Sequence, residues 1–219
     1  MYAASAILFD LDGTLIDTAG DIAAALDALL VERGRNALGE SAARGLVGDG
    51  ARVLIEKGWR ASGAPIPSAA ELDALVERWI SIYEADIARR SRPYPRVPET
   101  LASLRARGLK LAVVTNKADL PTAKLLAALK LDAFFDAVVG GDVPVRKPDA
   151  RHVRAGLAAL GVSAPETVFV GDSPNDAASA RAAGLRFLAV PYGYSHGPVD
   201  ALRADRILAS FDELAEAIA

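Results

Sequence analysis

The sequence has no cysteine, which excludes disulfides and metal sites built from thiolates. It has only two histidines, His152 and His196, and a zinc site would need most of them together with carboxylates. Any metal is therefore expected to be a hard cation such as Mg2+, held by oxygen ligands.

Long apolar runs are also missing, because no stretch reaches the roughly 18 residues that span a membrane. The N-terminal stretch has no basic leader and reaches Asp10 too early for a secretory signal, so we expect a cytoplasmic protein. There is no excess of positive charge either: the net charge is −3, which gives no electrostatic reason to bind nucleic acid or anionic lipid. The sequence leaves open whether the protein is a monomer or a homodimer.

What the sequence does have is 219 residues, 52% of them hydrophobic and 24% charged, enough for one α/β domain with an insert. Short apolar runs ending in Asp, Thr or Gly recur, and we interpret them as buried parallel strands. These runs span 6–10, 110–115, 135–139, 167–171 and 186–190. Segments with helical periodicity lie between the later runs, at 98–107, 119–129, 149–160 and 174–183. This alternation predicts an α/β fold with a doubly wound, Rossmann-like parallel sheet.

The interval between the first run and the second is far too long for a single crossover helix. Within it, residues 17–92 are rich in helix formers, and Ser91-Arg-Pro-Tyr-Pro95 resembles a hinge back to the sheet. We therefore predict two domains: an α/β core of residues 1–16 and 93–219, and an inserted all-helical cap of residues 17–92.

Polar residues follow the predicted strands at their carboxyl ends, where open α/β sheets bind ligands. Asp10 ends the first run and begins Asp10-Leu-Asp-Gly-Thr-Leu15. Thr115-Asn-Lys117 follows the second run, and Gly171-Asp-Ser-Pro-Asn-Asp176 follows the fourth. Lys147-Pro148 precedes the helix between the third and fourth runs.

Each motif also has a purely structural interpretation. The Asp-Gly pair could form a turn, and Thr115-Asn116 could cap a helix. Lys147 could be a surface lysine, and Asp172 could be an N-cap with Asp176 favourably placed near the helix N-terminus. Four such motifs in this order, all at predicted strand ends, favour a single site instead.

The residue types suit the hydrolysis of a phosphate monoester. Such an ester is doubly negative and repels a carboxylate, so attack by Asp10 needs a cation, for which Asp10 and Asp172 are candidate ligands. The leaving oxygen is basic, and Asp12, two residues along an extended segment, can give it a proton. Asp12 would later take a proton from the water that hydrolyses the aspartyl-phosphate, and its backbone carbonyl could bind the metal. The candidates for binding the phosphate oxygens are Thr115, Asn116 and Lys147.

The four motifs resemble the signatures of the haloacid dehalogenase-like hydrolases, and the resemblance covers essentially the whole chain. It implies that Asp10 is the nucleophile and a Mg2+ ligand, and that Asp12 is the acid/base and a carbonyl ligand. It also implies that Asp172 is a metal ligand, with Asp176 supporting the metal or Lys147. The helical insert resembles the cap that follows the first strand in this family.

Within the family, Gly140-Gly-Asp-Val-Pro-Val145 and Tyr192-Gly-Tyr-Ser-His-Gly197 resemble the phosphoglycolate phosphatases. This implies a small phosphorylated metabolite as substrate, with 2-phosphoglycolate hydrolysed to glycolate and phosphate. Asp149-Ala-Arg151 departs from the His-Pro-containing stretch expected there. His196 is expected in a surface loop without a catalytic role.

In the cap, Gly48, Asp49, Gly50 and Arg52 are candidates for contacting the substrate, although the same stretch could be a plain glycine-rich turn. Arg52 and the amides near Gly48 would bind the substrate's carboxylate. Two enzymatic alternatives remain, a phosphatase and a phosphomutase acting on a sugar phosphate. A non-enzymatic alternative is a phospho-receiver or binding module, which is about half as long and needs no cap.

Overall fold

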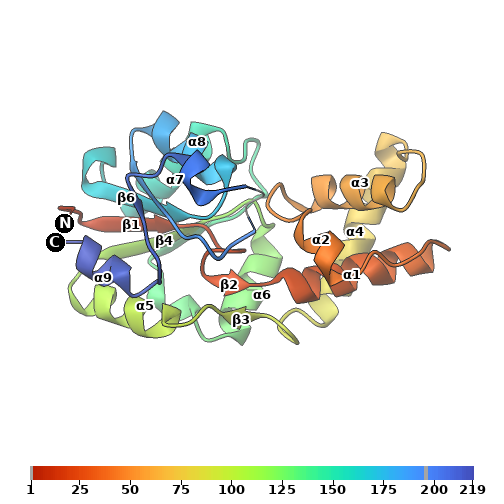
Figure 1. Cartoon of the computed structure of the whole chain (residues 1–219), viewed down its shortest axis with the longest axis horizontal. Helices are drawn as coiled ribbons and strands as arrows, with labels where there is room; N and C mark the ends of the chain where they lie inside the picture. The colour runs from red at the N-terminus through yellow and green to blue at the C-terminus, as the bar shows by residue number, and fades with distance from the viewer. Residues whose placement is uncertain (1, 195–196) are drawn as a thin grey trace.

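The structure is a computed structural model that describes residues 2–194 and 197–219. Its centre is a six-stranded sheet in the order β5-β4-β1-β6-β7-β8, with all neighbouring strands parallel. The strands are β1 (Ala6–Phe9), β4 (Lys110–Val114), β5 (Ala137–Val139), β6 (Thr167–Gly171), β7 (Arg186–Ala189) and β8 (Arg206–Ile207). Helices cover both faces of this sheet, which confirms the predicted fold class (Figure 1).

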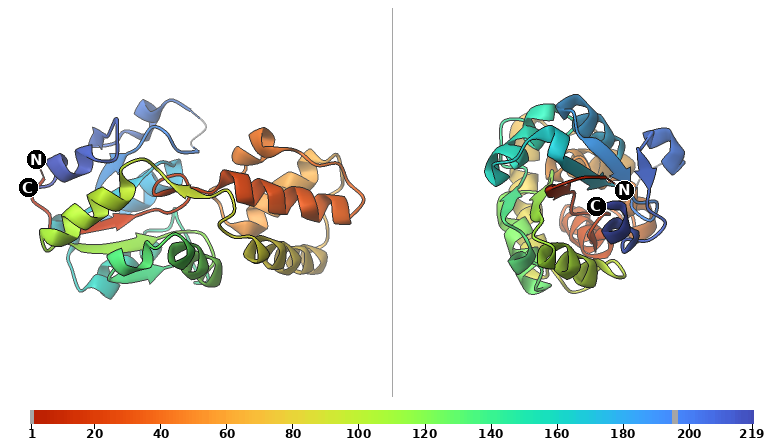
Figure 2. Two further views of the ribbon diagram at one scale, coloured as in Figure 1. Left: turned by 90° about the horizontal axis from the view of Figure 1, so that it is seen from below. Right: turned by 90° about the vertical axis from the view of Figure 1, so that its left-hand side faces the viewer.

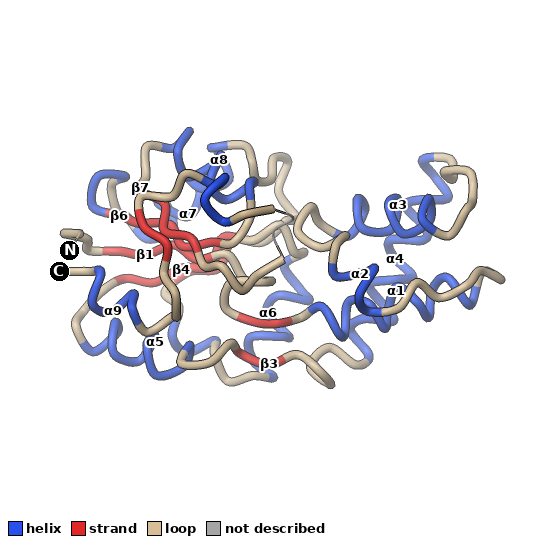
Figure 3. The backbone as a smooth tube through the Cα atoms, in the orientation of Figure 1, coloured by secondary structure: helices blue, strands red, loops and turns tan. Residues whose placement is uncertain are grey.

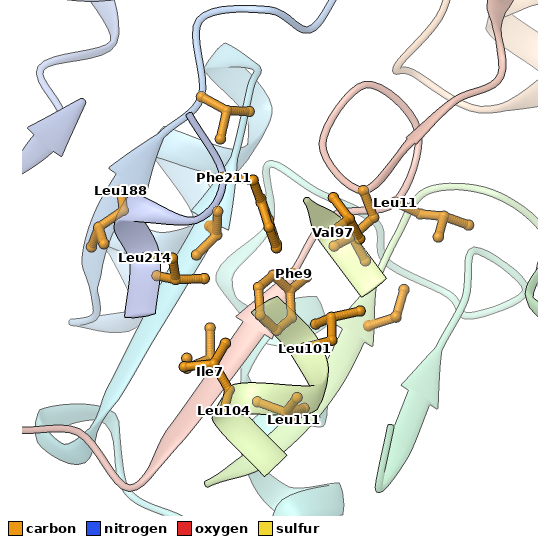
Figure 4. Close-up of a cluster of buried hydrophobic side chains, with 14 of the residues drawn as sticks. Ile7, Phe9, Leu11, Val97, Leu101, Leu104, Leu111, Leu188, Phe211 and Leu214 are labelled. Atoms are coloured by element: carbon orange, nitrogen blue, oxygen red, sulfur yellow. The ribbon is translucent and has the colours of Figure 1, made fainter. Parts of the chain in front are cut away.

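Strand β1 lies in the middle of the sheet and is buried on both faces. Ile7 and Phe9 pack into one hydrophobic cluster, shown in Figure 4, whereas Ala6 and Leu8 pack into a second cluster on the other face. The first face is covered by α5 (Val97–Ala106), α6 (Asp119–Ala128) and α9 (Glu213–Ala217), and the second by α7 (Ala150–Leu160) and α8 (Pro174–Ala183). The near-continuous apolar runs of the sequence are the signature of such doubly covered strands.

The direction of winding reverses at β1. The chain passes from β1 through β4 to β5 at one edge, and then from β6 through β7 to β8 at the other. The carboxyl ends of β1, β4 and β6 therefore meet at the switch point, where ligands bind in sheets of this kind.

Between β1 and β4 the chain forms a separate helical lobe with a hydrophobic core of its own. Its helices are α1 (Ala19–Glu32), α2 (Glu40–Arg44), α3 (Ala51–Ala61) and α4 (Ala69–Ala85). Figure 3 shows only helices and loops in this lobe, and Figure 2 shows how narrow the joint to the sheet lobe is. We refer to the lobe below as the cap.

The joint is a two-stranded antiparallel sheet of β2 (Ile16–Asp17) and β3 (Arg92–Pro93). Beside it, the buried carboxylate of Asp21 in α1 accepts the backbone N–H groups of Arg90 and Ser91, and the hydroxyl of Ser91. These bonds fix the returning chain against α1.

The remaining regular elements are short 3-10 helices at η1 (Asp132–Phe134), η2 (Ala164–Glu166) and η3 (Val199–Leu202). The two ends of the described chain lie together, far from the cap, because Tyr2 exchanges backbone hydrogen bonds with Ala217 and Ala219. No helix in the described part combines the length and apolar composition that crossing a membrane requires.

Candidate active site

Asp10 follows the last residue of β1 and is almost completely buried, with 7% of its surface exposed. Its backbone N–H donates to Val170 of β6 at 3.0 Å, which continues the sheet into the site. Its Oδ1 lies 2.7 Å from Nζ of Lys147. The sequence motif after the first strand therefore forms no ordinary surface turn, because its first carboxylate points into a buried charged cluster.

Lys147 lies between two carboxylates. Its Nζ is 2.7 Å from Oδ1 of Asp176 as well as from Asp10, and only 1% of its side chain is exposed. Its backbone N–H donates to Asn116 Oδ1 at 2.9 Å and to His152 Nδ1 at 3.2 Å. The surface-lysine interpretation is therefore wrong.

His152 has a structural role that the sequence did not reveal. It is buried in α7, and its Nε2 lies 3.0 Å from the carbonyl of Gly140. Since Nδ1 accepts from Lys147, Nε2 carries the proton and donates to that carbonyl. Burial lowers the pKa of His152, so the ring stays neutral and holds the backbone of Lys147 in place.

Asp172 follows β6, the neighbour of β1 in the sheet. Its Oδ1 accepts the hydroxyl of Thr14 at 2.9 Å, and its Oδ2 accepts the backbone N–H of Tyr194 at 2.7 Å. If Gly13, which has φ +88°, were replaced by a residue with a side chain, its Cβ would lie 2.6 Å from Oδ2 of Asp172. A Cβ at Gly193 would lie 2.2 Å from the same oxygen. Glycine at both positions lets the backbone close around this carboxylate.

Asp176 supports this arrangement from the first turn of α8. Its Oδ2 accepts the backbone N–H groups of Asp172 and Ser173 and the hydroxyl of Ser173, while Oδ1 pairs with Lys147. Both of its oxygens are thus in use.

These carboxylates suit a divalent cation. Oxygens of Asp10, Asp172 and Asp176 lie within 4.8 Å of one another, and all three residues are buried. Burial, together with the neighbouring carboxylates, raises the pKa of Asp10 to about 7 and that of Asp172 to about 8. A hard cation among them would offset this repulsion, and oxygen-only ligands are what Mg2+ prefers.

Asp12 is held by residues from both lobes. Its Oδ1 accepts the hydroxyl of Thr18 at 2.7 Å, and Lys117 Nζ lies 3.2 and 3.3 Å from its two oxygens. Lys117 is also buried, with Nζ 4.4 Å from the ring centre of Tyr83 in α4. The sequence motif contained Lys117, but nothing in its spacing indicated this pairing.

Thr115 and Asn116 follow β4 and are buried beside Asp10 and Lys147. Oγ1 of Thr115 accepts the N–H of Lys117 at 3.2 Å. Nδ2 of Asn116 donates to the carbonyls of Gly48 and Lys147, both at 3.1 Å. Asn116 therefore connects the cap loop to the segment that carries Lys147.

The predicted cap residues divide into two groups. Gly48, Asp49 and Gly50 reach the site: Asp49 accepts the side-chain amide of Asn175 at 2.7 Å and pairs with Lys57 at 2.6 Å. Arg52 is not brought there, because its guanidinium pairs with Asp73 at 2.8 Å and it does not line the cleft. His196 lies outside the described residues.

A cleft between the lobes opens onto Asp10 and Asp12 and has two branches. The larger, of about 190 Å³, has polar and charged residues in its lining, among them Asp172, Ser173, Asn175, Asp49 and Lys57. The smaller, of about 40 Å³, lies beside Thr115 and Lys117 and is closed by apolar and aromatic cap residues. Those cap residues are Ile22, Val47, Leu54, Trp79, Ile80 and Tyr83.

Comparison with known proteins gives the same assignment as the motifs. The model of the haloacid dehalogenase-like hydrolase family matches residues 7–190. A phosphoglycolate phosphatase of Caulobacter vibrioides is 45% identical over 212 residues, which are 96% of this chain and 89% of that protein. A phosphoglycolate phosphatase of Agrobacterium fabrum is 38% identical over 96% of this chain and 91% of its own length.

Solved structures resemble the whole molecule, including the cap. A predicted phosphoglycolate phosphatase from Haemophilus somnus superimposes with a TM-score of 0.91 at 29% identity, covering 99% of both chains. A mutant of CbbY from Rhodobacter sphaeroides, in complex with xylulose-(1,5)bisphosphate, has a TM-score of 0.81 at 27% identity over 96% of both chains. From its motifs, its fold and these similarities, the chain belongs to the haloacid dehalogenase-like hydrolase family.

Proposed function

We propose that the protein is a Mg2+-dependent phosphatase that hydrolyses 2-phosphoglycolate to glycolate and phosphate through an aspartyl-phosphate on Asp10. The observation that carries this proposal is the position of Asp10, buried against Lys147 and Asp172 at the point where both branches of the cleft meet. The substrate follows from the two relatives above, which are named phosphoglycolate phosphatases.

In this proposal Asp10 attacks phosphorus, and the other charged residues prepare the attack. The carboxylates of Asp10 and Asp172, with the backbone carbonyl of Asp12, would hold Mg2+. Asp176 would not bind the cation directly, because its two oxygens already bond to Lys147 and Ser173. The bound cation would neutralise charge between nucleophile and phosphate. Lys147 and Thr115 would bind phosphoryl oxygens as negative charge develops on them.

Asp12 would act as the acid and then the base. Thr18 and Lys117 hold its carboxylate at the cleft, where it can give a proton to the leaving oxygen of glycolate. In the second step it would take the proton of the water that cleaves the aspartyl-phosphate. Both steps need one carboxylate held in one position.

The domain division has a functional meaning in this scheme. Both predicted boundaries, 16/17 and 92/93, fall inside the small sheet of β2 and β3. We propose that this sheet is the joint about which the cap of residues 17–92 opens to admit substrate and closes to exclude water.

Sugar phosphates remain the rival substrates, since the CbbY structure was solved with a sugar bisphosphate. The smaller branch of the cleft, of about 40 Å³, would take only a small substituent of the ester. A phosphomutase would return the phosphoryl group to a sugar, so release of inorganic phosphate separates the two reactions. Family membership removes the phospho-receiver alternative.

The decisive experiment is a phosphate-release assay of the purified protein with Mg2+ and a panel of monoesters. We expect the highest kcat/KM with 2-phosphoglycolate. A higher value with a pentose or hexose phosphate would overturn the substrate assignment but leave the chemistry of Asp10 standing.

The nucleophile is tested by Asp10→Asn, because an amide is a poor nucleophile and removes one metal-ligand charge. We expect no steady-state phosphate release from a folded variant. The matched control is Asp132→Asn, an exposed carboxylate outside the cleft, which should keep wild-type activity. Substantial turnover by Asp10→Asn would refute the aspartyl-phosphate.

A further inference from the structure

Four side chains in the described part of the cap carry a buried hydrogen-bond donor that finds no acceptor, those of Arg35, Arg52, Trp79 and Tyr83. Two of these donors, the indole N–H of Trp79 and the hydroxyl of Tyr83, belong to residues only 5% and 1% exposed. A buried donor without an acceptor destabilises the folded protein, and most such groups find a partner. These two therefore call for an explanation.

Both donors belong to the cleft. Trp79 and Tyr83 are four residues apart in α4, so they project from the same face of the helix. Their rings stack with centroids 5.1 Å apart and planes 5° from parallel, and both residues line the smaller branch beside Asp10 and Asp12. The stacking holds the two rings as one rigid surface.

The charged groups that line the smaller branch are the ammonium of Lys117 and the carboxylates of Asp10 and Asp12. Lys117 Nζ lies 4.4 Å from the Tyr83 ring centre and is the only Lys or Arg among the described residues that line this branch. An ammonium group only donates, so Lys117 offers no acceptor for the proton of Tyr83. Burial raises the pKa of Tyr83, so its hydroxyl keeps that proton and remains a donor.

We propose that Trp79 and Tyr83 bind the carboxylate of the substrate, each donating one hydrogen bond to it, and so determine specificity for a carboxylated two-carbon ester. This inference rests on the proposed function and replaces Arg52, which the structure places against Asp73, as the carboxylate-binding part of the cap. The branch, of about 40 Å³, has room for a group as small as a carboxymethyl group.

Two isosteric changes test the proposal, Trp79→Phe and Tyr83→Phe, each of which removes a donor and keeps an aromatic ring. Loss of a hydrogen bond to a charged group should raise KM for 2-phosphoglycolate about tenfold in each variant, and more in the double variant. KM for ethyl phosphate, which has a methyl group in place of the carboxylate, should stay within about twofold of the wild-type value.

The chain offers a matched control. Trp59→Phe also alters a buried cap tryptophan, but this residue does not line the cleft. The control should keep the wild-type KM for 2-phosphoglycolate.

The outcomes separate the two proposals. A wild-type enzyme active on 2-phosphoglycolate whose double variant keeps the wild-type KM would overturn the carboxylate-binding role alone. An equal rise in KM for ethyl phosphate would overturn it too, because the donors would then act on something other than the carboxylate. A wild type inactive on 2-phosphoglycolate would overturn the proposed function and this inference with it.

Discussion

At the scale of single residues, the site depends on a balance of buried charges. Lys147 pairs with both Asp10 and Asp176 at 2.7 Å, and Lys117 pairs with Asp12. Asp172 pairs with no cation among the described residues and is held by Thr14 and Tyr194 instead. The protein alone thus leaves carboxylate charge unbalanced where Asp10 and Asp172 meet, and Mg2+ would balance it.

Asp12→Asn separates metal binding from proton transfer. The variant should still bind Mg2+, because the proposed ligand is the backbone carbonyl, but it should hydrolyse 2-phosphoglycolate about 100-fold or more slowly. An ester with a good leaving group, such as p-nitrophenyl phosphate, needs less help from an acid and should lose less in its first step. The measurement is burst and steady-state kinetics on both esters. If Asp12→Asn hydrolysed 2-phosphoglycolate at the wild-type rate, Asp12 would have no role as the acid.

At the scale of elements, the central strands and their helices were predictable, because doubly covered strands give apolar runs that stand out in the sequence. The edge strand β8 and the joint strands β2 and β3 are two residues each and carry no such run. Helix α4 ends at Ala85, since the following residues turn to place Arg90 and Ser91 on Asp21. Such tertiary contacts leave no periodic signal.

The site shows the same division between local and long-range information. Asp10, Lys147 and Asp172 were recognisable because each follows a strand or precedes a helix in a known motif. The partners Tyr83 and Tyr194 come from distant segments, and only the folded chain brings them to Lys117 and Asp172. Arg52 shows the converse, because a cation near the cap loop in sequence is turned away from the cleft by Asp73.

The contact between α1 and the returning chain gives a prediction at this scale. Asp21→Ala removes a buried carboxylate that accepts two backbone N–H groups and one hydroxyl. Leaving these donors unpaired should lower the free energy of unfolding by about 2–4 kcal/mol, measured by urea titration. Asp73→Ala, an exposed partner of Arg52, should cost less than about 1 kcal/mol. Equal effects would show that the Asp21 contact does not stabilise the joint.

At the scale of the whole molecule, stability should depend on pH and Mg2+ together. The pKa of Asp10 is raised to about 7 and that of Asp172 to about 8, above an unfolded value of about 4. A carboxyl that binds its proton more tightly when folded contributes stability at low pH and loses it as pH rises through these values. Mg2+ binds the deprotonated carboxylates, so it should restore the loss.

We therefore expect Mg2+ to raise Tm more at about pH 8.5 than at about pH 5.5, where it must displace protons. Thermal unfolding with Mg2+ or with a chelator at both pH values measures this difference. The double variant Asp10→Asn, Asp172→Asn serves as the control and should show little response to Mg2+. An equal gain at both pH values in the wild type would contradict the assignment of these ligands.

The position of β1 has a consequence for how the protein is made. This strand leaves the ribosome before both of its neighbours in the sheet, β4 and β6, which pair with Ala6 through Lys110 and Thr167. The cap helices between them contact mainly one another, so the cap can fold before β1 has paired with β4 and β6. Contacts between residues close in sequence form fastest. A nascent chain that ended before β6 would therefore contain a folded cap and Asp10. It would lack the β6 partner of β1, and hence the catalytic centre. Activity should emerge late in synthesis, after the strand that carries Asp172 has emerged and inserted beside β1.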